Sequence, residues 1–415
     1  MEQKNLVPKR RFKEFQNTSA WEQRKLGEVA DIIGGGTPST SNEEYWDGDI
    51  DWYSPVEIGE QIYVDSSQKK ITELGLQKSS AKILPIGTVL FTSRAGIGNT
   101  AILAKEGATN QGFQSIVPHK DELDSYFIYS RTHELKRYGE TNGAGSTFVE
   151  VSGKQMAQMP ILIPTLEEQK KIGGFFERLD NLITLHQRKL EKMKALKSAY
   201  LSEMFPAEGE PVPKRRFAGF TQAWEQRKLG EMMEVTSVKR IHQSDWTDEG
   251  VRFLRARDIV CASKGEEPTD YLYISQEKYD EYSRISGKVK VGDLLVTGVG
   301  TIGVPLLVTQ EEPLYFKDGN IIWFKNEKQL DGNFFYYSFI GESIQKYIRD
   351  VAGIGTVGTY TIDSGKKTPI QIPSYEEQEK IGNFFKQLDH LITLHQRKLE
   401  KLQNIKKAYL NEMFV

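Results

Sequence analysis

Several arginine and amide side chains in this sequence could form hydrogen bonds with the edges of DNA bases. Arg94 lies in the run FTSRAGIGN, and Asn110 and Gln111 are neighbours in ATNQGFQ. Arginine can donate two hydrogen bonds to guanine in the major groove, and asparagine or glutamine can pair with adenine. We therefore consider these three residues as candidate DNA contacts, together with Gly35, Thr37, Ser39, Lys239, Arg240, Arg255 and Arg257.

A simpler interpretation stays open for each candidate. The charged side chains could be solvated or structural, and Gly34–Gly36 could form an ordinary loop. Arg255 and Arg257 are spaced by two in the strand-like run VRFLRARDI. Such a spacing would place both side chains on one face of a strand. We expect Trp52 and Trp246 to be core residues or stacking platforms rather than residues that distinguish bases.

The motifs that would indicate catalysis are absent from the sequence. It contains no GxxxxGK[ST] phosphate loop, no Asn-Pro-Pro-aromatic methyltransferase box, no HExxH and no GxSxG. The run SGKKT at Ser364–Thr368 lacks the upstream glycine of a phosphate loop. The 6 histidines do not cluster, and Cys261 is the single cysteine, so a disulfide within the chain and a cysteine zinc site are excluded. We expect no catalytic residue and no metal in this chain.

The composition limits the class of protein further. The net charge of −2 is unlike that of most nucleic-acid-binding proteins, so DNA binding would need local basic patches or help from partners. A length of 415 residues predicts two or three domains, and 38% hydrophobic residues are enough for packed cores. The sequence shows neither a secretory signal nor an apolar run of membrane-spanning length. Together with the single cysteine, this favours a cytoplasmic protein without a membrane span.

A tandem duplication organises the whole chain. Its two copies are offset by about 205 residues, which is half the sequence rather than the short period of a solenoid. The segments between the repeated blocks are dissimilar, which indicates one framework carrying two different variable segments. The alternative is a duplicated domain whose loops have simply drifted. The repeated blocks are VPKRRF (Val7–Phe12 and Val212–Phe217), WEQRKLGE (Trp21–Glu28 and Trp224–Glu231) and a long block (Ile163–Phe205 and Ile372–Phe414).

Each long block predicts one helix of about 40 residues, or about 60 Å. Apolar residues recur at heptad spacing, and no proline falls between Pro164 and Pro206 or after Pro373. Thr165 and Ser374 are candidate N-caps, each followed by Glu-Glu-Gln, as the helix dipole favours. The stripe residues expected to pair the helices or to bind a partner are Ile172, Phe176, Leu179, Ile183, His186 and Leu190, then Ile381, Phe385, Leu388, Ile392, His395 and Leu399.

The simplest partner for one such helix is its own copy. Antiparallel pairing would relate the two halves by a pseudo-twofold axis and bring the middles of the two stripes together. His186 and His395 would then be polar residues that set the register of a coiled coil. The sequence thus predicts an α+β fold, with two mixed α/β domains separated by two long antiparallel helices.

At this point the repeated blocks resemble a known family. The combination of the duplicated EEQ…FF…LD…RKLE blocks, WEQRKLGE at the start of each half, and GGTPS followed by YWDGDIDW is similar to the DNA-specificity subunit of type I restriction–modification systems. The resemblance covers essentially the whole chain. The second half departs from it, since TSVKRIHQSD (Thr236–Asp245) stands where GGTPS would be expected.

The resemblance implies a division of the chain into five parts. These are a constant N-terminal segment (1–20), a first target-recognition domain (21–160), a central constant helix (161–209), a second target-recognition domain (210–369) and a C-terminal constant helix (370–415). Each recognition domain would read one half of a split DNA target, and the helices would set the spacer.

The resemblance also implies partners and cofactors outside this chain. The helices would dock two modification subunits, which bind S-adenosylmethionine and methylate adenine. Two restriction or motor subunits using ATP and magnesium would complete the complex, so the chain itself would bind double-stranded DNA without catalysing a reaction. Rival interpretations are a stand-alone DNA methyltransferase or nuclease with unfamiliar motifs, and a duplicated coiled-coil adaptor that binds only proteins.

Overall fold

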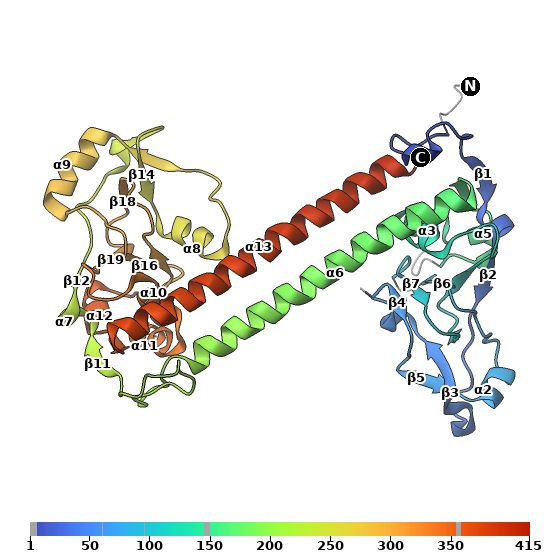
Figure 1. Ribbon diagram of the computed structural model, residues 1–415, viewed down its shortest axis with the longest axis horizontal. Helices are drawn as coiled ribbons and strands as arrows, with labels where there is room; N and C mark the ends of the chain where they lie inside the picture. Colours follow the sequence, from blue (N-terminus) through green and yellow to red (C-terminus); the bar gives the residue numbers. More distant parts are fainter. Residues whose placement is uncertain (1–5, 60, 95, 145–149, 354–357) are drawn as a thin grey trace. The chain divides into compact units, whose positions relative to one another are not determined.

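The chain folds into two compact units, shown in the ribbon diagram of a computed structural model (Figure 1). The structure describes residues 6–59, 61–94, 96–144, 150–353 and 358–415. The first unit contains residues 1–186 and 398–415, and the second contains residues 187–397. The predicted boundaries of the recognition domains stay predictions. The unit boundaries fall inside the long helices.

The first unit is built on two mixed sheets and a short ladder. The larger sheet has the strand order β2 (Ala30–Gly34), β9 (Gln114–Pro118), β6 (Val89–Phe91), β7 (Thr100–Leu103) and β4 (Tyr63–Val64). The smaller sheet places β3 (Trp46–Tyr53) between antiparallel β5 (Lys69–Ile71) and parallel β8 (Ala108–Thr109). The ladder joins β1 (Glu22–Lys25) to β10 (Pro160–Ile163).

Short helices cover the strands of the first unit. The strands β6 and β7 are fully buried apolar runs, VLF and TAIL, which is why they lie inside the sheet. The helices are α1 (Leu26–Val29), α2 (Glu73–Gln77), α3 (Ser125–Tyr129), α4 (Thr132–Asn142) and α5 (Gly153–Ala157), with 3-10 turns at Lys13–Phe15, Glu43–Tyr45 and Pro55–Glu57.

The second unit repeats this scaffold although its sequence differs. The sheet β12 (Glu234–Thr236), β19 (Ile321–Lys325), β16 (Leu294–Thr297) and β17 (Pro305–Leu307) matches β2-β9-β6-β7. A second sheet has the order β13 (Trp246–Thr247), β15 (Leu272–Ile274), β14 (Val251–Leu254) and β18 (Leu314–Phe316), and β14 pairs in parallel with β18 as β3 does with β8. The ladder β11 (Glu225–Lys228) with β20 (Pro369–Ile372) has the register of its counterpart.

The helices of the second unit are slightly longer than those of the first. They are α7 (Leu229–Met232), α8 (Ala256–Lys264), α9 (Gln276–Ser286), α10 (Gly332–Ile340), α11 (Glu342–Ala352) and α12 (Ile362–Lys367), with a 3-10 turn at Gln243–Asp245. Strand β14 ends at Leu254, so the expectation that VRFLRARDI is one strand is wrong. Asp258 accepts a hydrogen bond from the Arg255 backbone N–H at 2.8 Å and thereby caps α8.

Two long helices are confirmed, α6 (Leu166–Glu203, 38 residues) and α13 (Tyr375–Met413, 39 residues). Both start where the capping signals predict, and the Thr165 hydroxyl accepts from the Glu168 N–H at 3.4 Å. In the first unit the start of α6 packs on the end of α13, with the rings of Phe175 and Tyr409 5.1 Å apart. Further along α6, the Asp180 carboxylate lies 2.6 Å from the ammonium nitrogen of Lys406, which comes before Tyr409 in α13. The helices therefore run antiparallel there.

The second unit shows the same antiparallel pairing in its own helix ends. The ring of Tyr200, near the end of α6, lies 5.1 Å from that of Phe384, near the start of α13. Lys197, earlier in α6, is 2.6 Å from Asp389, later in α13. A phenylalanine just after each long helix also completes a core. The rings of Phe414 and Trp21 are 6.1 Å apart in the first unit, and those of Phe205 and Trp224 are 6.1 Å apart in the second.

The repeated sequence blocks interlock through a buried ion pair in each unit. In the first unit Arg11 of PKRRF donates to Glu168 of the Glu-Glu-Gln motif at 2.7 and 2.6 Å. In the second unit Arg216 donates to Glu377 at 2.7 Å through two nitrogens. Both carboxylates are fully buried. A bidentate pair of this kind fixes the angle between its two segments as well as their distance.

A tyrosine, an aspartate and a lysine join the short helices of each unit to its long helices. The Tyr126 hydroxyl donates to Asp180 at 3.0 Å, and Lys406 binds the other oxygen of the same carboxylate. Burial and the Asp180 charge raise the pKa of Tyr126 well above its ordinary value, which keeps the donor protonated. In the second unit the Tyr337 hydroxyl donates to Asp389 at 2.7 Å. These clusters were not predicted from the sequence.

Candidate nucleic-acid interface

Three loops of the first unit meet beside the strands that carry them. They are the segment after β2, the segment after β8 and the turn between β6 and β7. The Gly36 N–H donates to the Thr109 carbonyl at 2.8 Å, and the Ser93 N–H donates to the Gly112 carbonyl at 2.8 Å. The Thr37 hydroxyl donates to the side chain of Gln111. The structure therefore brings Gly35, Thr37, Arg94, Asn110 and Gln111 into one loop cluster.

The glycine at position 35 is required by this cluster. A Cβ atom there would lie 2.0 Å from the Asn110 carbonyl oxygen and 2.3 Å from the Thr109 carbonyl oxygen. Only glycine allows so close an approach of two backbones. The Asn110 side-chain oxygen accepts from the Gly112 N–H at 2.7 Å, so it first holds the turn. Gln111 is exposed on the same turn.

Two indoles hold the GGTPS segment in place. The indole N–H of Trp52 donates to the Gly36 carbonyl at 2.8 Å, and the indole N–H of Trp46 donates to the Ser39 carbonyl at 3.1 Å. Trp52 is buried, which confirms its expected place in the core. The Ser39 hydroxyl bonds that of Ser41 at 2.8 Å and stays exposed. Because their backbone is fixed, Thr37 and Ser39 are presented at a defined position.

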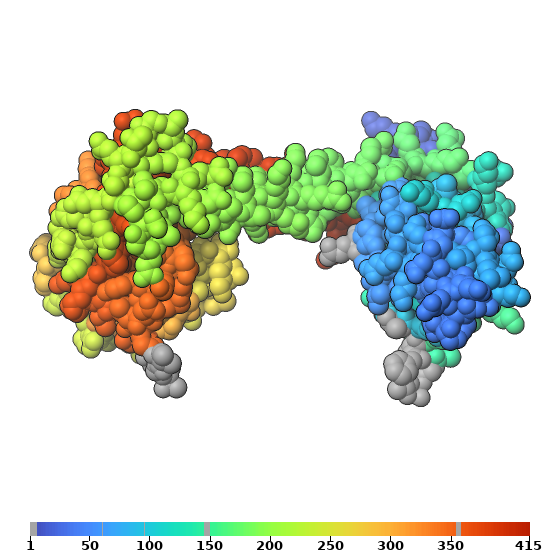
Figure 2. All heavy atoms as spheres, turned by 90° about the horizontal axis from the view of Figure 1, so that it is seen from below, coloured from blue at the N-terminus to red at the C-terminus, as the bar shows by residue number. Residues whose placement is uncertain are grey.

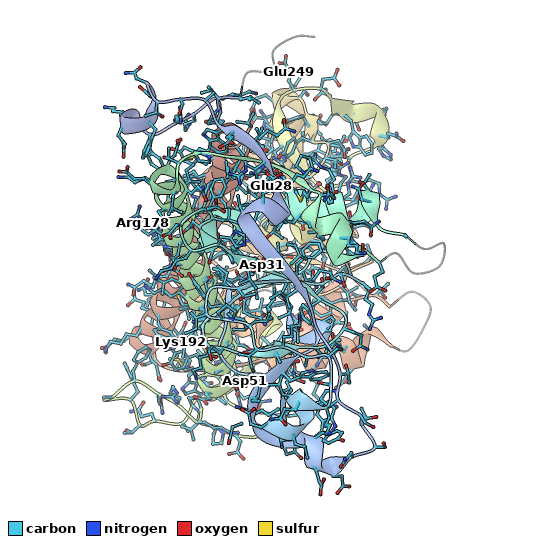
Figure 3. All side chains as sticks on the ribbon, turned by 90° about the vertical axis from the view of Figure 1, so that its right-hand side faces the viewer. Glu28, Asp31, Asp51, Arg178, Lys192 and Glu249 are labelled. Carbon is cyan, nitrogen blue, oxygen red and sulfur yellow. The ribbon has the colours of Figure 1, made fainter. Side chains whose placement is uncertain are left out.

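The strand under this cluster is anchored by a buried carboxylate. Asp51 of β3, labelled in Figure 3, accepts from the backbone N–H of Ser67 at 2.9 Å and from its hydroxyl at 3.0 Å. Burial would raise the pKa of Asp51, but these bonds and Lys70 outweigh burial and hold that pKa below its ordinary value. The carboxylate thus stays ionised and pins the exposed edge of the small sheet.

Arg94 is the cation of the first loop cluster, and its ion pair is weak. Its side chain is 36% exposed and lies 3.9 Å from the exposed Glu150. An exposed pair at this distance contributes less than about 1 kcal/mol, so a DNA group can replace Glu150 at little cost.

The second unit forms the same cluster with different side chains. The Lys317 N–H donates to the Leu254 carbonyl at 2.8 Å, just as the Asn110 N–H donates to Tyr53 at 3.0 Å in the first unit. Lys317 and Asp318 therefore occupy the positions of Asn110 and Gln111. Arg240 donates to Asp318 at 2.8 Å, in the place of the Thr37 contact.

Lys317 was not singled out by the sequence, because the segments around β8 and β18 share no recognisable pattern. Lys239, beside Arg240 in the sequence, stacks its ammonium 4.0 Å from the ring centre of Tyr282. This cation–π contact orients Lys239 and still leaves the side chain on the surface.

Arg255 and Arg257 lie in a different environment from the one predicted. Arg255 caps α8, is 17% exposed and donates to Asp258 at 3.0 Å and to Asp270 at 2.8 Å. Arg257 lies in the first turn of α8 and also binds Asp270. Hydrogen bonds from Arg255 lower the pKa of Asp270 to about 2. The two arginines share one carboxylate rather than one face of a strand, and Arg255 is mainly structural.

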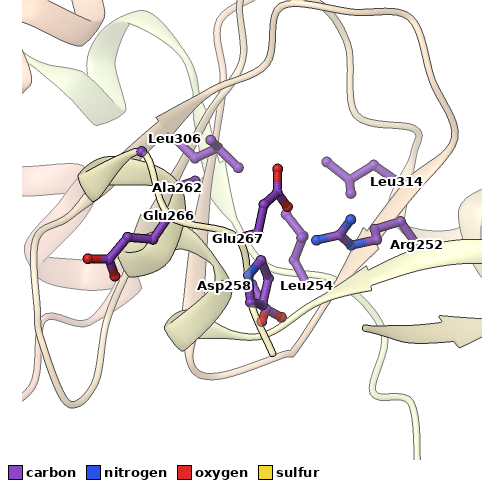
Figure 4. Close-up of a pocket in the computed structure, with 10 residues that line it drawn as sticks. Arg252, Leu254, Asp258, Ala262, Glu266, Glu267, Leu306 and Leu314 are labelled. Carbon is purple, nitrogen blue, oxygen red and sulfur yellow. The ribbon is translucent and has the colours of Figure 1, made fainter. Parts of the chain in front are cut away.

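A cavity of about 460 Å³ opens beside these arginines (Figure 4). The guanidinium of Arg252 points toward Leu254 and Glu267 in this view. Arg252 also lies 3.8 Å from the ring centre of Tyr271. Three carboxylates, those of Asp258, Glu266 and Glu267, line the cavity with one cation, Arg252. The cavity therefore has no net attraction for a phosphate backbone.

The stripe residues of the long helices lie where the heptad pattern places them. The twelve side chains predicted for pairing or docking are all buried or half-buried, from Ile172 to Leu190 in α6 and from Ile381 to Leu399 in α13. Four leucines between them are exposed: Leu182 and Leu185 in α6, and Leu391 and Leu394 in α13. They occupy equivalent places in the repeated sequence LITLH. A repeated exposed apolar surface is typical of a protein-binding site.

Two further properties of the described residues bear on the class of site. Among the residues that the structure describes, no group of three histidine, cysteine or carboxylate side chains could hold a metal ion. Over the same ranges, no helix has the length and apolar character needed to cross a membrane.

Comparison with known proteins adds independent findings. The sequence model of the family described as type I restriction modification DNA specificity domain matches residues 18–195 and again residues 221–404. The MjaIX specificity subunit of a type I restriction enzyme from Methanocaldococcus jannaschii is 28% identical over 413 residues, covering 95% of this chain and 92% of that protein. The EcoR124I/EcoR124II specificity subunit from Escherichia coli is 30% identical over 169 residues, which is 39% of this chain and 41% of that protein.

A solved structure supports the fold. The S subunit of a type-I restriction-modification system from M. genitalium superposes with a TM-score of 0.63 at 15% sequence identity and covers 99% of both chains.

Proposed function

This chain belongs to the family of type I restriction modification DNA specificity domains, and from that premise we propose that it selects the DNA target of a type I restriction–modification complex. Each matched region contributes one domain that reads one half of a bipartite target. The chain catalyses no step itself. The proposal locates the complex in the cytoplasm, together with the DNA on which it acts.

The observation that carries this proposal is the shared loop cluster with different side chains. In the first unit Asn110, Gln111 and Thr37 stand at positions that Lys317, Asp318 and Arg240 take in the second. Base pairs are distinguished by the donor and acceptor pattern of the side chains that meet them in the major groove. One backbone frame with two sets of polar groups is therefore suited to recognising two different half-sites.

The partners follow from the repeated surface of the helices. We propose that two modification subunits dock on the exposed leucines, one around Leu182 and Leu185 and the other around Leu391 and Leu394. These partners would bind S-adenosylmethionine and methylate adenine, and two motor subunits would use ATP and magnesium. Basic surfaces on the partners would supply much of the phosphate neutralisation that a chain of net charge −2 lacks.

The helices are proposed to set the spacer between the half-sites. Two linked reading domains bind together only where both half-sites lie within reach of the connection between them. Because α6 and α13 are unbroken over 38 and 39 residues, the connection is stiff rather than a flexible linker.

Methylome sequencing of a host with and without the gene tests the proposal. We expect one bipartite motif with a fixed spacer to lose its adenine methylation when the gene is deleted. An unchanged methylome, with the modification subunit expressed, would argue against the proposal. Methyl transfer by the purified chain alone would instead favour the stand-alone methyltransferase. A gel shift that never appears, with or without the modification subunit, would favour the protein adaptor.

A further inference from the structure

A cavity of about 470 Å³ in the second unit lies outside the loop cluster. It is formed by the end of α6, the linker that follows it, β20 and the start of α11. Its lining includes Phe205, Pro206, Trp224, Ser338, Gly341 and Gln371. Figure 2 shows the yellow-green linker beside the orange surface of α10 and α11, which border this cavity. The volume falls in the range of ordinary ligand sites.

The corresponding space in the first unit is filled by a side chain of this protein. Arg131, at the N-cap of α4, is 3% exposed. Its guanidinium carbon lies 5.6 Å from the ring centre of Phe414 and 5.8 Å from that of Phe127. One nitrogen donates to the Leu162 carbonyl at 2.6 Å, and another donates to Glu134 at 2.5 Å. An arginine therefore fits a socket made of an aromatic floor, a strand carbonyl and a carboxylate.

The second unit keeps an aromatic ring and the strand carbonyl of this socket. It lacks the arginine, and Ile344 stands third after the N-cap of α11, where Glu134 stands in α4. Gly341 is the N-cap of α11, as Arg131 is of α4. Gln371 pairs with Gln226 in the ladder where Leu162 pairs with Gln23, so its carbonyl holds the place of the Leu162 carbonyl. Phe205 lines the cavity in the place of Phe414, and the fully buried Phe334, in the place of Phe127, lies 5.8 Å from it between ring centres.

A buried polar atom marks the cavity as unfilled. Ser338 is 6% exposed, and its hydroxyl has no hydrogen-bond partner among the described residues. A buried hydroxyl without a partner is destabilising, so a bound donor or acceptor would stabilise this site.

The charges around the cavity favour a cation. Three carboxylates, Glu208, Glu342 and Asp350, line it together with one ammonium group, that of Lys346. Lys346 binds Glu208, and Arg349 on the neighbouring turn binds Glu342. The carboxylates of the lining thus outnumber its ammonium group.

We propose that this cavity, hereafter the guanidinium socket, binds an arginine side chain presented by a protein partner. The occupant is inferred from the first unit, where the chain's own Arg131 lies over the ring of Phe414 and donates to the Leu162 carbonyl, the counterparts of Phe205 and the Gln371 carbonyl. The proposal does not depend on DNA reading by the loop cluster, and each can fail without the other.

The test uses the full-length chain and a blocked arginine, N-acetyl-L-arginine methylamide, as the probe. Titration is followed by the indole N–H signals of the 6 tryptophans in NMR spectra, with Trp224 assigned from the Trp224→Phe variant. We expect saturable binding that shifts the Trp224 signal, with a dissociation constant on the order of 1 mM for so small a ligand. The uncharged isostere, N-acetyl-L-citrulline methylamide, should bind at least about tenfold more weakly, because charge-assisted bonds are lost.

A matched variant extends the test to the first unit. Arg131→Ala opens the corresponding space there, so the probe should bind at a second site and also shift the signal of Trp21, which contacts Phe414. Should this variant fail to fold, the titration of the unaltered chain decides the matter. The proposal is overturned if the blocked arginine does not shift Trp224 up to roughly 20 mM, or if the citrulline compound binds equally well.

Discussion

The buried pair between Arg11 and Glu168 gives a prediction whose magnitude follows from its geometry. Arg11 is 5% exposed and Glu168 is fully buried, and two bonds of 2.7 and 2.6 Å join them. Removing one partner of such a pair costs roughly 3–5 kcal/mol, because the remaining charge stays buried. Glutamine keeps one acceptor oxygen, so Glu168→Gln should cost about 3 kcal/mol, the lower end of this range.

The assay is urea unfolding of the full-length chain, supported by calorimetry. For a unit of about 200 residues, this loss corresponds to a fall of roughly 6–12 °C in melting temperature. Glu412→Gln is the matched control, since its pair with Arg10 is largely exposed and its removal should change the stability little. Equal effects of the two substitutions would refute the reasoning. Replacing both Arg11 and Glu168 with methionine should recover most of the lost stability.

Three further outcomes are expected. Tyr126→Phe should lower the free energy of unfolding, measured by urea titration, by roughly 1–2 kcal/mol, because Asp180 loses a buried donor. No change would show that this hydrogen bond does not hold the first unit on its helices. Hydrogen bonds that the His119 ring donates to Glu122 and Asp31 raise the pKa of His119, so its stabilising effect should be complete below pH 6.5 and disappear as the pH rises through that raised value. NMR titration should find this pKa above 6.5, and His119→Asn should remove that part of the pH dependence. Inserting four residues after Lys192 and after Lys401, about one helical turn or 5.4 Å in each helix, should change the spacer of the methylated motif, and an unchanged spacer would refute the ruler role.

The repeat and its helices could be predicted from the sequence because both are local signals. Heptad spacing, the absence of proline and the capping residues Thr165 and Ser374 gave the starts of α6 and α13 correctly. Pairing of the helices followed from the need of each apolar stripe for a partner. The antiparallel direction was a prediction beyond that need, and the Phe175–Tyr409 and Asp180–Lys406 contacts confirm it in the first unit.

The contacts that assemble the candidate interface could not be predicted, because they join residues far apart in sequence. Arg255 was placed in a strand because its neighbours are β-branched and aromatic, yet the capping carboxylate of Asp258 starts a helix there. Lys317 could not be predicted, because its equivalence to Asn110 appears only when β18 is aligned with β8 in space. Tyr126 and Tyr337 reach equivalent aspartates from different turns of their helices, so sequence alignment would not pair them.

The central claim is that each unit reads its own half of the target, and a domain exchange tests it most directly. Residues 26–160 are replaced by residues 229–369, so that both halves carry the second variable segment between unchanged repeated blocks. Adenine methylation is then mapped in a host that expresses this chain with the modification subunit. We predict a new motif in which the first half-site has become a copy of the second, with the spacer unchanged. Methylation that still requires the original first half-site would contradict the account.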